Sequence, residues 1–166
     1  MGEIVFIPDL SAYVCAFKWA VPLRAVGWLE CPYPYATGTA PLGLAEKLAA
    51  LMAQPIIISM GCDVCSLCAE SGTETTGFIW SRIVYIPGDA EVFVVPGGVV
   101  HYVESHTYLP PGRFIEAVFR CPDPDSPAYW AAMTRSNAGI EVPIRPRPVL
   151  SSAVHGLLSQ KLLLSQ

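Results

Sequence analysis

Prolines and glycines are spread along the whole chain, and they limit the length of every helix and strand that it can form. The 166 residues include 16 prolines and 13 glycines, with no internal repeat and no low-complexity linker. A proline removes a backbone donor and fixes φ, so it ends a helix or lies at the edge of a sheet. The sequence therefore predicts many short elements joined by tight turns, within a single domain that spans residues 1–166.

The pattern of apolar residues predicts an α+β fold with a small antiparallel sheet and several short helices. The clearest helix lies at 42–53, where leucines recur at helical spacing and Pro55 prevents continuation. Strand-like runs at 78–86 and 91–95 flank a Pro-Gly-Asp turn, which predicts an antiparallel hairpin. We expect further strands at 3–7, 25–29 and 55–60, helices at 96–109, 114–119 and 128–133, and an extended segment and helix within 140–166.

Composition and charge disfavour several classes of function. Hydrophobic residues make up 52% of the chain, which is enough to bury a sizeable core. A net charge of −4 does not suit a nucleic-acid-binding surface. No uninterrupted apolar stretch reaches the roughly 18 to 20 residues of a membrane span, and no basic residue precedes Lys18 as a secretory signal requires. We therefore expect a cytoplasmic protein with reduced cysteines and no nucleic-acid or membrane partner.

Two cysteines and two histidines have the spacing of a structural zinc site. Cys65 and Cys68 form a CxxC pair, and His101 and His106 follow after the predicted hairpin. On an ideal helix the two histidine side chains would be roughly 140° apart. Both reach one ion only if the last helical turn loosens, as a helix end before Pro110-Pro111 would allow. The sequence thus predicts Zn²⁺ bound by these four residues.

The predicted zinc unit is a cysteine knuckle, a hairpin and a helix at about residues 60–110. The 32 residues between Cys68 and His101 are too many for a short nucleic-acid-binding finger, so we interpret the site as a staple within a larger domain. Because this segment is expected to hold little core of its own, chelation or Cys65→Ser should unfold residues 62–108.

The cysteine pattern leaves two other interpretations open. Cys62, Cys65, Cys68 and Cys121 could hold an iron–sulfur cluster, although the fourth cysteine is distant and no flavin or nucleotide motif is present. A redox dithiol of Cys65 and Cys68 would normally open a helix, whereas the polar stretch 69–76 predicts a loop. The remaining thiols, Cys15, Cys31 and Cys121, are expected to be buried apolar residues, and His155 is expected to be structural.

Catalytic motifs are sparse. Glu104 lies between the two histidines and is the candidate base if the chain is a zinc-dependent hydrolase with an open metal position. Residues 101–106 do not form an HExxH motif, and the deaminase, nucleotide-binding and GxSxG patterns are absent from the sequence. The sequence therefore favours a non-enzymatic protein that binds a partner protein. Its candidate contact residues are the aromatic side chains Trp28, Tyr33, Tyr35 and Trp130, and its acidic charge suits a basic partner such as a nuclease toxin.

Two blocks of sequence resemble a family of small, largely uncharacterised bacterial zinc-binding-like proteins. The first block is Val26-Gly27-Trp28-Leu29 followed by Pro32-Tyr33-Pro34 and Thr37-Gly38, and the second is the CxxC pair with HYVxxHxYxPPxxFIEAV at 101–118. Family members carry a histidine two positions before the CxxC pair, where this chain has Asp63, so the resemblance leaves open whether Cys62 replaces one ligand. The resemblance covers residues 25–120 and implies a zinc-binding domain of the bacterial cytoplasm, with a role as an immunity or regulatory partner and no established activity.

Overall fold

A four-stranded sheet with the order β1-β4-β3-β2 lies at the centre of the fold. The structure is a computed structural model, and it describes residues 6–15, 19–53, 57–58, 64–73 and 82–136. Cys62, Asp63, His155 and the expected C-terminal segment at 140–166 lie outside the described residues. The assignment of residues 1–166 to one domain therefore stays a prediction.

The predicted hairpin forms the middle of this sheet. Strands β3 (Arg82–Pro87) and β4 (Val92–Pro96) pair antiparallel, with Val84 opposite Val95. Strand β2 (Ile57–Ile58) pairs antiparallel with β3, while β1 (Leu23–Ala25) runs parallel to β4. The sheet is therefore mixed: the predicted antiparallel part, β2 to β4, gains one parallel strand at its edge.

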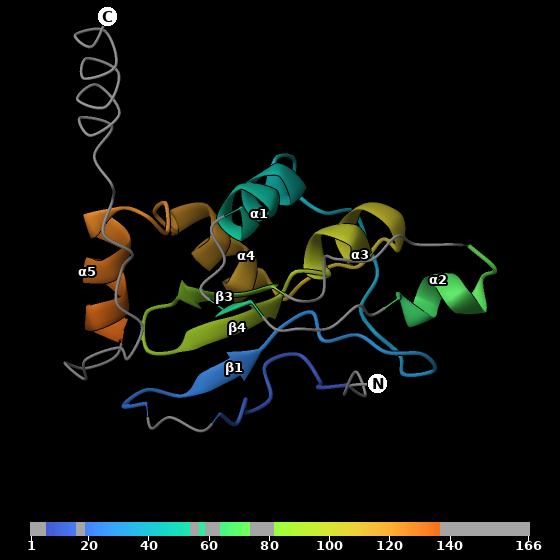
Figure 1. Cartoon of the computed structure of the whole chain (residues 1–166), viewed down its shortest axis with the longest axis horizontal. Coiled ribbons are helices and arrows are strands. Elements are labelled where there is room, and N and C mark those ends of the chain that lie inside the picture. Colours follow the sequence, from blue (N-terminus) through green and yellow to red (C-terminus); the bar gives the residue numbers. More distant parts are fainter. Residues whose placement is uncertain (1–5, 16–18, 54–56, 59–63, 74–81, 137–166) are drawn as a thin grey trace, which may run out of the picture.

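Within the described residues, five short helices complete the α+β fold that the sequence predicts (Figure 1). Figure 1 shows α1 and α4 on one side of the sheet and the segment that precedes β1 on the other, with α5 and α2 at opposite ends of the molecule. The helices are α1 (Leu44–Met52), α2 (Ser66–Glu70), α3 (Val99–Ser105), α4 (Gly112–Arg120) and α5 (Pro127–Ser136).

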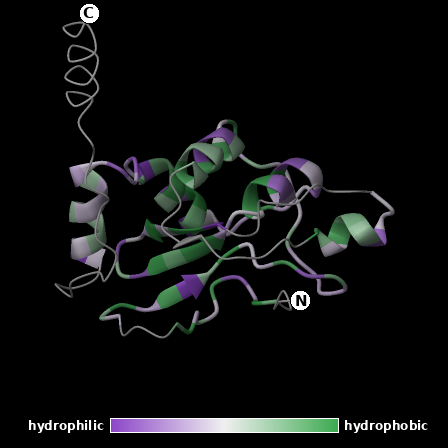
Figure 2. Cartoon of the chain, viewed as in Figure 1, coloured by the Kyte–Doolittle hydropathy of each residue, from purple (hydrophilic) through white to green (hydrophobic). Residues whose placement is uncertain are grey.

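The core is centred on β3 and β4, which are apolar along most of their length (Figure 2). All five residues of β4 are buried, because both faces of this inner strand are covered. Phe93 of β4 meets Phe114 of α4 edge to face, with ring centroids 5.4 Å apart. Trp19 packs against Tyr85 of β3, and the Tyr129 hydroxyl of α5 donates to the Tyr85 carbonyl oxygen at 2.6 Å.

Two expected elements differ in extent. The strand expected at 25–29 ends at Ala25, because Gly27 adopts a left-handed conformation with φ of 76° that turns the chain out of the sheet. The helix expected from Pro96 begins only at Val99, since Pro96 is the last residue of β4. The short helix that results contains His101 and ends at Ser105, directly before His106.

Candidate metal centre

The end of α3 brings the two histidines together. His101 lies within the helix, whereas His106 follows its last helical residue and has φ of −120° and ψ of 15°. The next residue, Thr107, has a positive φ of 50°. Because the helix ends here, the two side chains converge and their Nε2 atoms lie 3.2 Å apart. The prediction that the last turn must loosen is confirmed.

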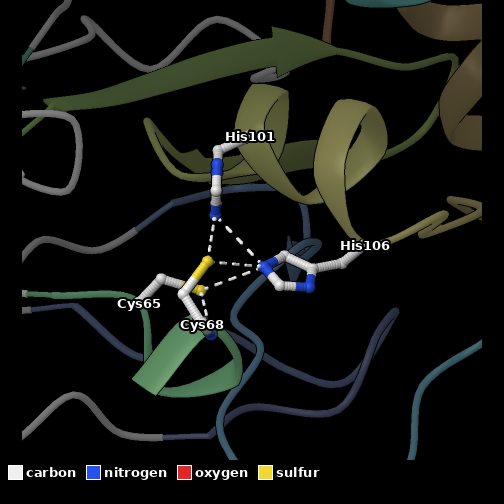
Figure 3. A group of neighbouring side chains, drawn as sticks. All are labelled: Cys65, Cys68, His101 and His106. Carbon is white, nitrogen blue, oxygen red and sulfur yellow. Dashed lines mark hydrogen bonds between the residues drawn. The ribbon is translucent and has the colours of Figure 1, made fainter. Parts of the chain in front are cut away.

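The two cysteines lie at the start of α2, whereas the sequence predicted a cysteine knuckle followed by a loop. Cys65 is the N-cap residue, and its Sγ accepts a hydrogen bond from the Cys68 backbone N–H at 3.4 Å. The expected loop at 69–76 was wrong for residues 69 and 70, because the thiol caps a short helix that continues to Glu70. Both cysteine side chains are buried, and the capped turn directs both sulfurs toward the histidines (Figure 3).

The four ligand atoms form one close group. They lie within 4.8 Å of one another, and each comes from a different residue (Figure 3). Cys68 Sγ is 3.3 Å from His101 Nε2 and 3.2 Å from His106 Nε2, and Cys65 Sγ is 3.4 Å from His106 Nε2. A tetrahedral zinc ion with the usual bond lengths separates its sulfur and nitrogen ligands by about 3.3 to 3.8 Å. These sulfur–nitrogen distances are therefore close to those of a tetrahedral ion, and the most widely separated ligand atoms, which lie within 4.8 Å, would have to approach each other.

The environment favours neutral histidines. Burial lowers the pKa of His101, and the neighbouring His106 lowers it further. Burial also lowers the pKa of His106. A metal binds the neutral imidazole, so both rings are ready to act as ligands at neutral pH. The Cys65 thiol behaves differently, because burial raises its pKa to about 11.

Metal affinity should rise steeply with pH. Cys65 must lose its proton to bind a metal, and burial holds that proton up to a pKa of about 11. The dissociation constant for Zn²⁺ should therefore fall at least about tenfold for each pH unit between pH 6.5 and 8. Competition titrations against a chromophoric chelator with known pH dependence measure this slope. A dissociation constant that does not change over this range would contradict thiolate coordination.

Backbone and side-chain contacts hold the ligand-bearing loop after α3. The Gly38 N–H donates to the Thr107 carbonyl oxygen at 2.9 Å, and the Tyr35 hydroxyl donates to the His106 carbonyl oxygen at 3.4 Å. The Tyr102 hydroxyl donates to the Leu29 carbonyl oxygen at 2.9 Å. The two sequence blocks of the family resemblance thus contact each other in the fold.

Sequence reasoning missed one residue of this region, Asp9. Its carboxylate accepts hydrogen bonds from the Tyr108 hydroxyl at 2.7 Å and from the Gly27 N–H at 2.9 Å. Burial raises the pKa of Asp9, although these two hydrogen bonds oppose the shift. Asp9 and Tyr108 are 99 residues apart, and no local pattern could have connected them.

The other described cysteines do not join the group of ligands. Among the residues that the structure describes, Cys65, Cys68, His101 and His106 make up the cluster, and Cys121 is not a member. Cys121 is buried as expected, its thiol contacts the Pro122 carbonyl oxygen, and burial raises its pKa to about 12. Cys15 and Cys31 are only half-buried, so the expectation of full burial was wrong for these two. The described residues therefore do not assemble the iron–sulfur alternative.

These observations define an α+β protein with a Cys2His2 cluster that could bind a metal ion. Residues 5–119 match a family described as a domain of unknown function, DUF7919, and the chain belongs to this family. No curated protein and no solved structure gives a match to this sequence. None of the helices in the described part of the chain has the length and apolar character needed to cross a membrane.

Proposed function

We propose that this protein binds one structural Zn²⁺ ion through Cys65, Cys68, His101 and His106. The observation that carries the proposal is the convergence of the four ligand atoms within 4.8 Å. Two thiolates and two imidazoles are a common ligand set of structural zinc sites. Soft sulfur ligands disfavour magnesium and calcium, which prefer oxygen. In this role the ion joins the start of α2 to the end of α3.

Metal analysis tests this proposal. We expect about one zinc per chain in protein purified without added metal, and X-ray absorption should show two sulfur ligands at about 2.3 Å and two nitrogen ligands at about 2.0 Å. Cys65→Ser should lower the zinc content, whereas Cys121→Ser should leave it unchanged. Brown protein that contains iron would contradict zinc and favour the iron–sulfur alternative.

Zinc-dependent hydrolysis with Glu104 as the base is a second candidate function. One observation favours it: Glu104 and His101 line the same cavity. A catalytic zinc keeps a position open for water, whereas the structural role uses four protein ligands. A coordination sphere with one protein ligand missing and one oxygen present would therefore favour the hydrolase.

We further propose that the protein acts without catalysis in the bacterial cytoplasm, by binding a basic protein partner in an immunity or regulatory role. The net charge of −4 supports a basic partner. Of the four aromatic residues that the sequence singled out, Tyr33 is exposed, at 51% of its surface. Its ring stacks on Phe6, with centroids 4.3 Å apart and planes 5° from parallel. Trp28, Tyr35 and Trp130 are half-buried and pack against the core.

Tyr33→Ala should weaken partner binding by roughly 2 kcal/mol, or about thirtyfold, if Tyr33 is a central contact. The test starts from a basic protein captured from the native host, and it measures the affinity of the purified pair. Phe119→Ala is the matched control, because Phe119 is also exposed, at 46%, on α4. Equal affinity of the wild type and Tyr33→Ala would exclude Tyr33 from the contact surface.

A further inference from the structure

A cavity of about 370 Å³ lies between α1 and α3, beside the metal centre. Its apolar lining comes from Ala49 and Met52 of α1 and from Val100 of α3. Two charged residues, Arg82 and Glu104, line it as well, and so does the metal-centre residue His101. This volume falls within the usual range for small-molecule sites, and the lining combines an apolar surface with a few polar groups, as such sites do.

The two charges of the cavity are opposite in sign. Arg82 Nη1 donates to the Met52 carbonyl oxygen at 3.2 Å, and this bond holds the guanidinium against the end of α1. Glu104 is exposed on α3. None of the ion pairs found among the described residues involves Arg82 or Glu104. The cavity therefore presents a cation and an anion that do not neutralise each other by direct contact.

We propose that this cavity binds a small zwitterion with an apolar side chain, of the class of free apolar α-amino acids. The ligand carboxylate pairs with Arg82, its ammonium group pairs with Glu104, and its side chain packs on Met52 and Val100. A simple anion would leave Glu104 unpaired and repelled, and a simple cation would do the same at Arg82. A peptide terminus carries only one of the two charged groups. This inference goes beyond the proposed structural zinc ion, with which the cavity shares one residue, His101.

Binding should be measured on the zinc-loaded full chain with a matched set of ligands. The set comprises L-leucine, L-phenylalanine, 4-methylpentanoate, which lacks the ammonium group, and 3-methylbutylamine, which lacks the carboxylate. We expect L-leucine or L-phenylalanine to bind in isothermal titration or in ligand-observed NMR. The two singly charged analogues should bind at least roughly tenfold more weakly, because each leaves one charged side chain without its partner. Equal binding of an analogue and its parent amino acid would overturn the zwitterion assignment.

Two neighbouring alanines of α1 provide a matched pair of variants. Ala49 lines the cavity, whereas Ala50 does not, and both are exposed residues of one helix. Ala49→Leu should fill the cavity and abolish binding, and Ala50→Leu should bind like the wild type. Glu104→Gln should weaken the binding of the amino acid by roughly tenfold, whereas 4-methylpentanoate should bind at least as tightly as it does to the wild type. Binding that survives Ala49→Leu, or no binding of either amino acid, would overturn the proposal.

The zinc content of each variant separates this inference from the proposed metal site. Ala49→Leu and Glu104→Gln change no metal ligand, so both should keep about one zinc per chain. Loss of amino-acid binding with the zinc retained then assigns the effect to the cavity. Absence of zinc from the wild type would contradict the metal site, while the amino-acid titration would still test the cavity.

Discussion

Removal of zinc should lower the midpoint of thermal unfolding by about 12 °C. A ligand that is present at a thousand times its dissociation constant stabilises the folded state by about 4 kcal/mol. For a domain of this size, each kcal/mol corresponds to roughly 3 °C. Differential scanning calorimetry of zinc-loaded and chelator-treated protein measures the difference. An unchanged midpoint after complete metal removal would contradict a structural zinc ion.

The structure indicates which segments should lose their structure when the metal is removed. From the sequence alone we expected chelation to unfold the whole of 62–108, but β3 and β4 lie within that range and belong to the buried core. Metal loss should instead release α2 and the end of α3, which hydrogen exchange resolves residue by residue. Cys68→Ser should reproduce the effect of chelation. Cys121→Ala is the matched control, since Cys121 is a buried thiol outside the cluster. The Cys121→Ala protein should retain its zinc.

Gly27→Ala should destabilise the protein by about 3 kcal/mol. Gly27 is buried and has a φ of 76°, which costs an L-residue roughly 1 kcal/mol or more. A Cβ atom at this position would lie 2.8 Å from Val99 Cγ2, closer than carbon atoms can approach. Overpacking of this kind typically costs about 1 to 3 kcal/mol more. Urea denaturation gives the change in the free energy of unfolding.

Two further variants separate the cost of the positive φ from the cost of the steric overlap with Val99. Gly72 has a similar φ of 72°, but a Cβ atom there would have no neighbour within 4 Å. Gly72→Ala should therefore cost only about 1 kcal/mol. In the double variant Gly27→Ala/Val99→Ala, the steric overlap is removed. The loss in the free energy of unfolding should therefore be smaller than the sum of the losses in the two single variants. Strict additivity would contradict a contact between Gly27 and Val99.

The elements that follow from local pattern were predictable. The leucines of α1 recur at helical spacing, and the Pro-Gly-Asp turn between β3 and β4 predicted their hairpin. The grouping of Cys65, Cys68, His101 and His106 was also predictable, because a CxxC pair and a histidine pair in a chain with three histidines leave few alternatives. Even the loosened end of α3 followed from the requirement that two side chains five positions apart reach one ion.

Features that depend on tertiary contacts were not predictable. Whether Cys65 ends a turn or caps a helix depends on the direction of its thiol. That direction is set by the folded structure around Cys65 and cannot be predicted from the local sequence. The parallel pairing of β1 with β4 joins segments that have no shared local signal. The same holds for the cavity, since Ala49, Arg82 and Glu104 come from three different elements or their ends.

The parallel position of β1 also has a consequence for the rate at which this chain folds. Leu23 pairs with Val92, and the Asp9–Tyr108 hydrogen bond joins residues 99 apart. At a synthesis rate of about 5 to 20 residues per second, β4 leaves the ribosome several seconds after β1. Contacts between such distant segments slow folding, which we expect on roughly the millisecond-to-second timescale. During synthesis β1 therefore remains unpaired until β4 has been made, and its free backbone groups can then associate with other chains.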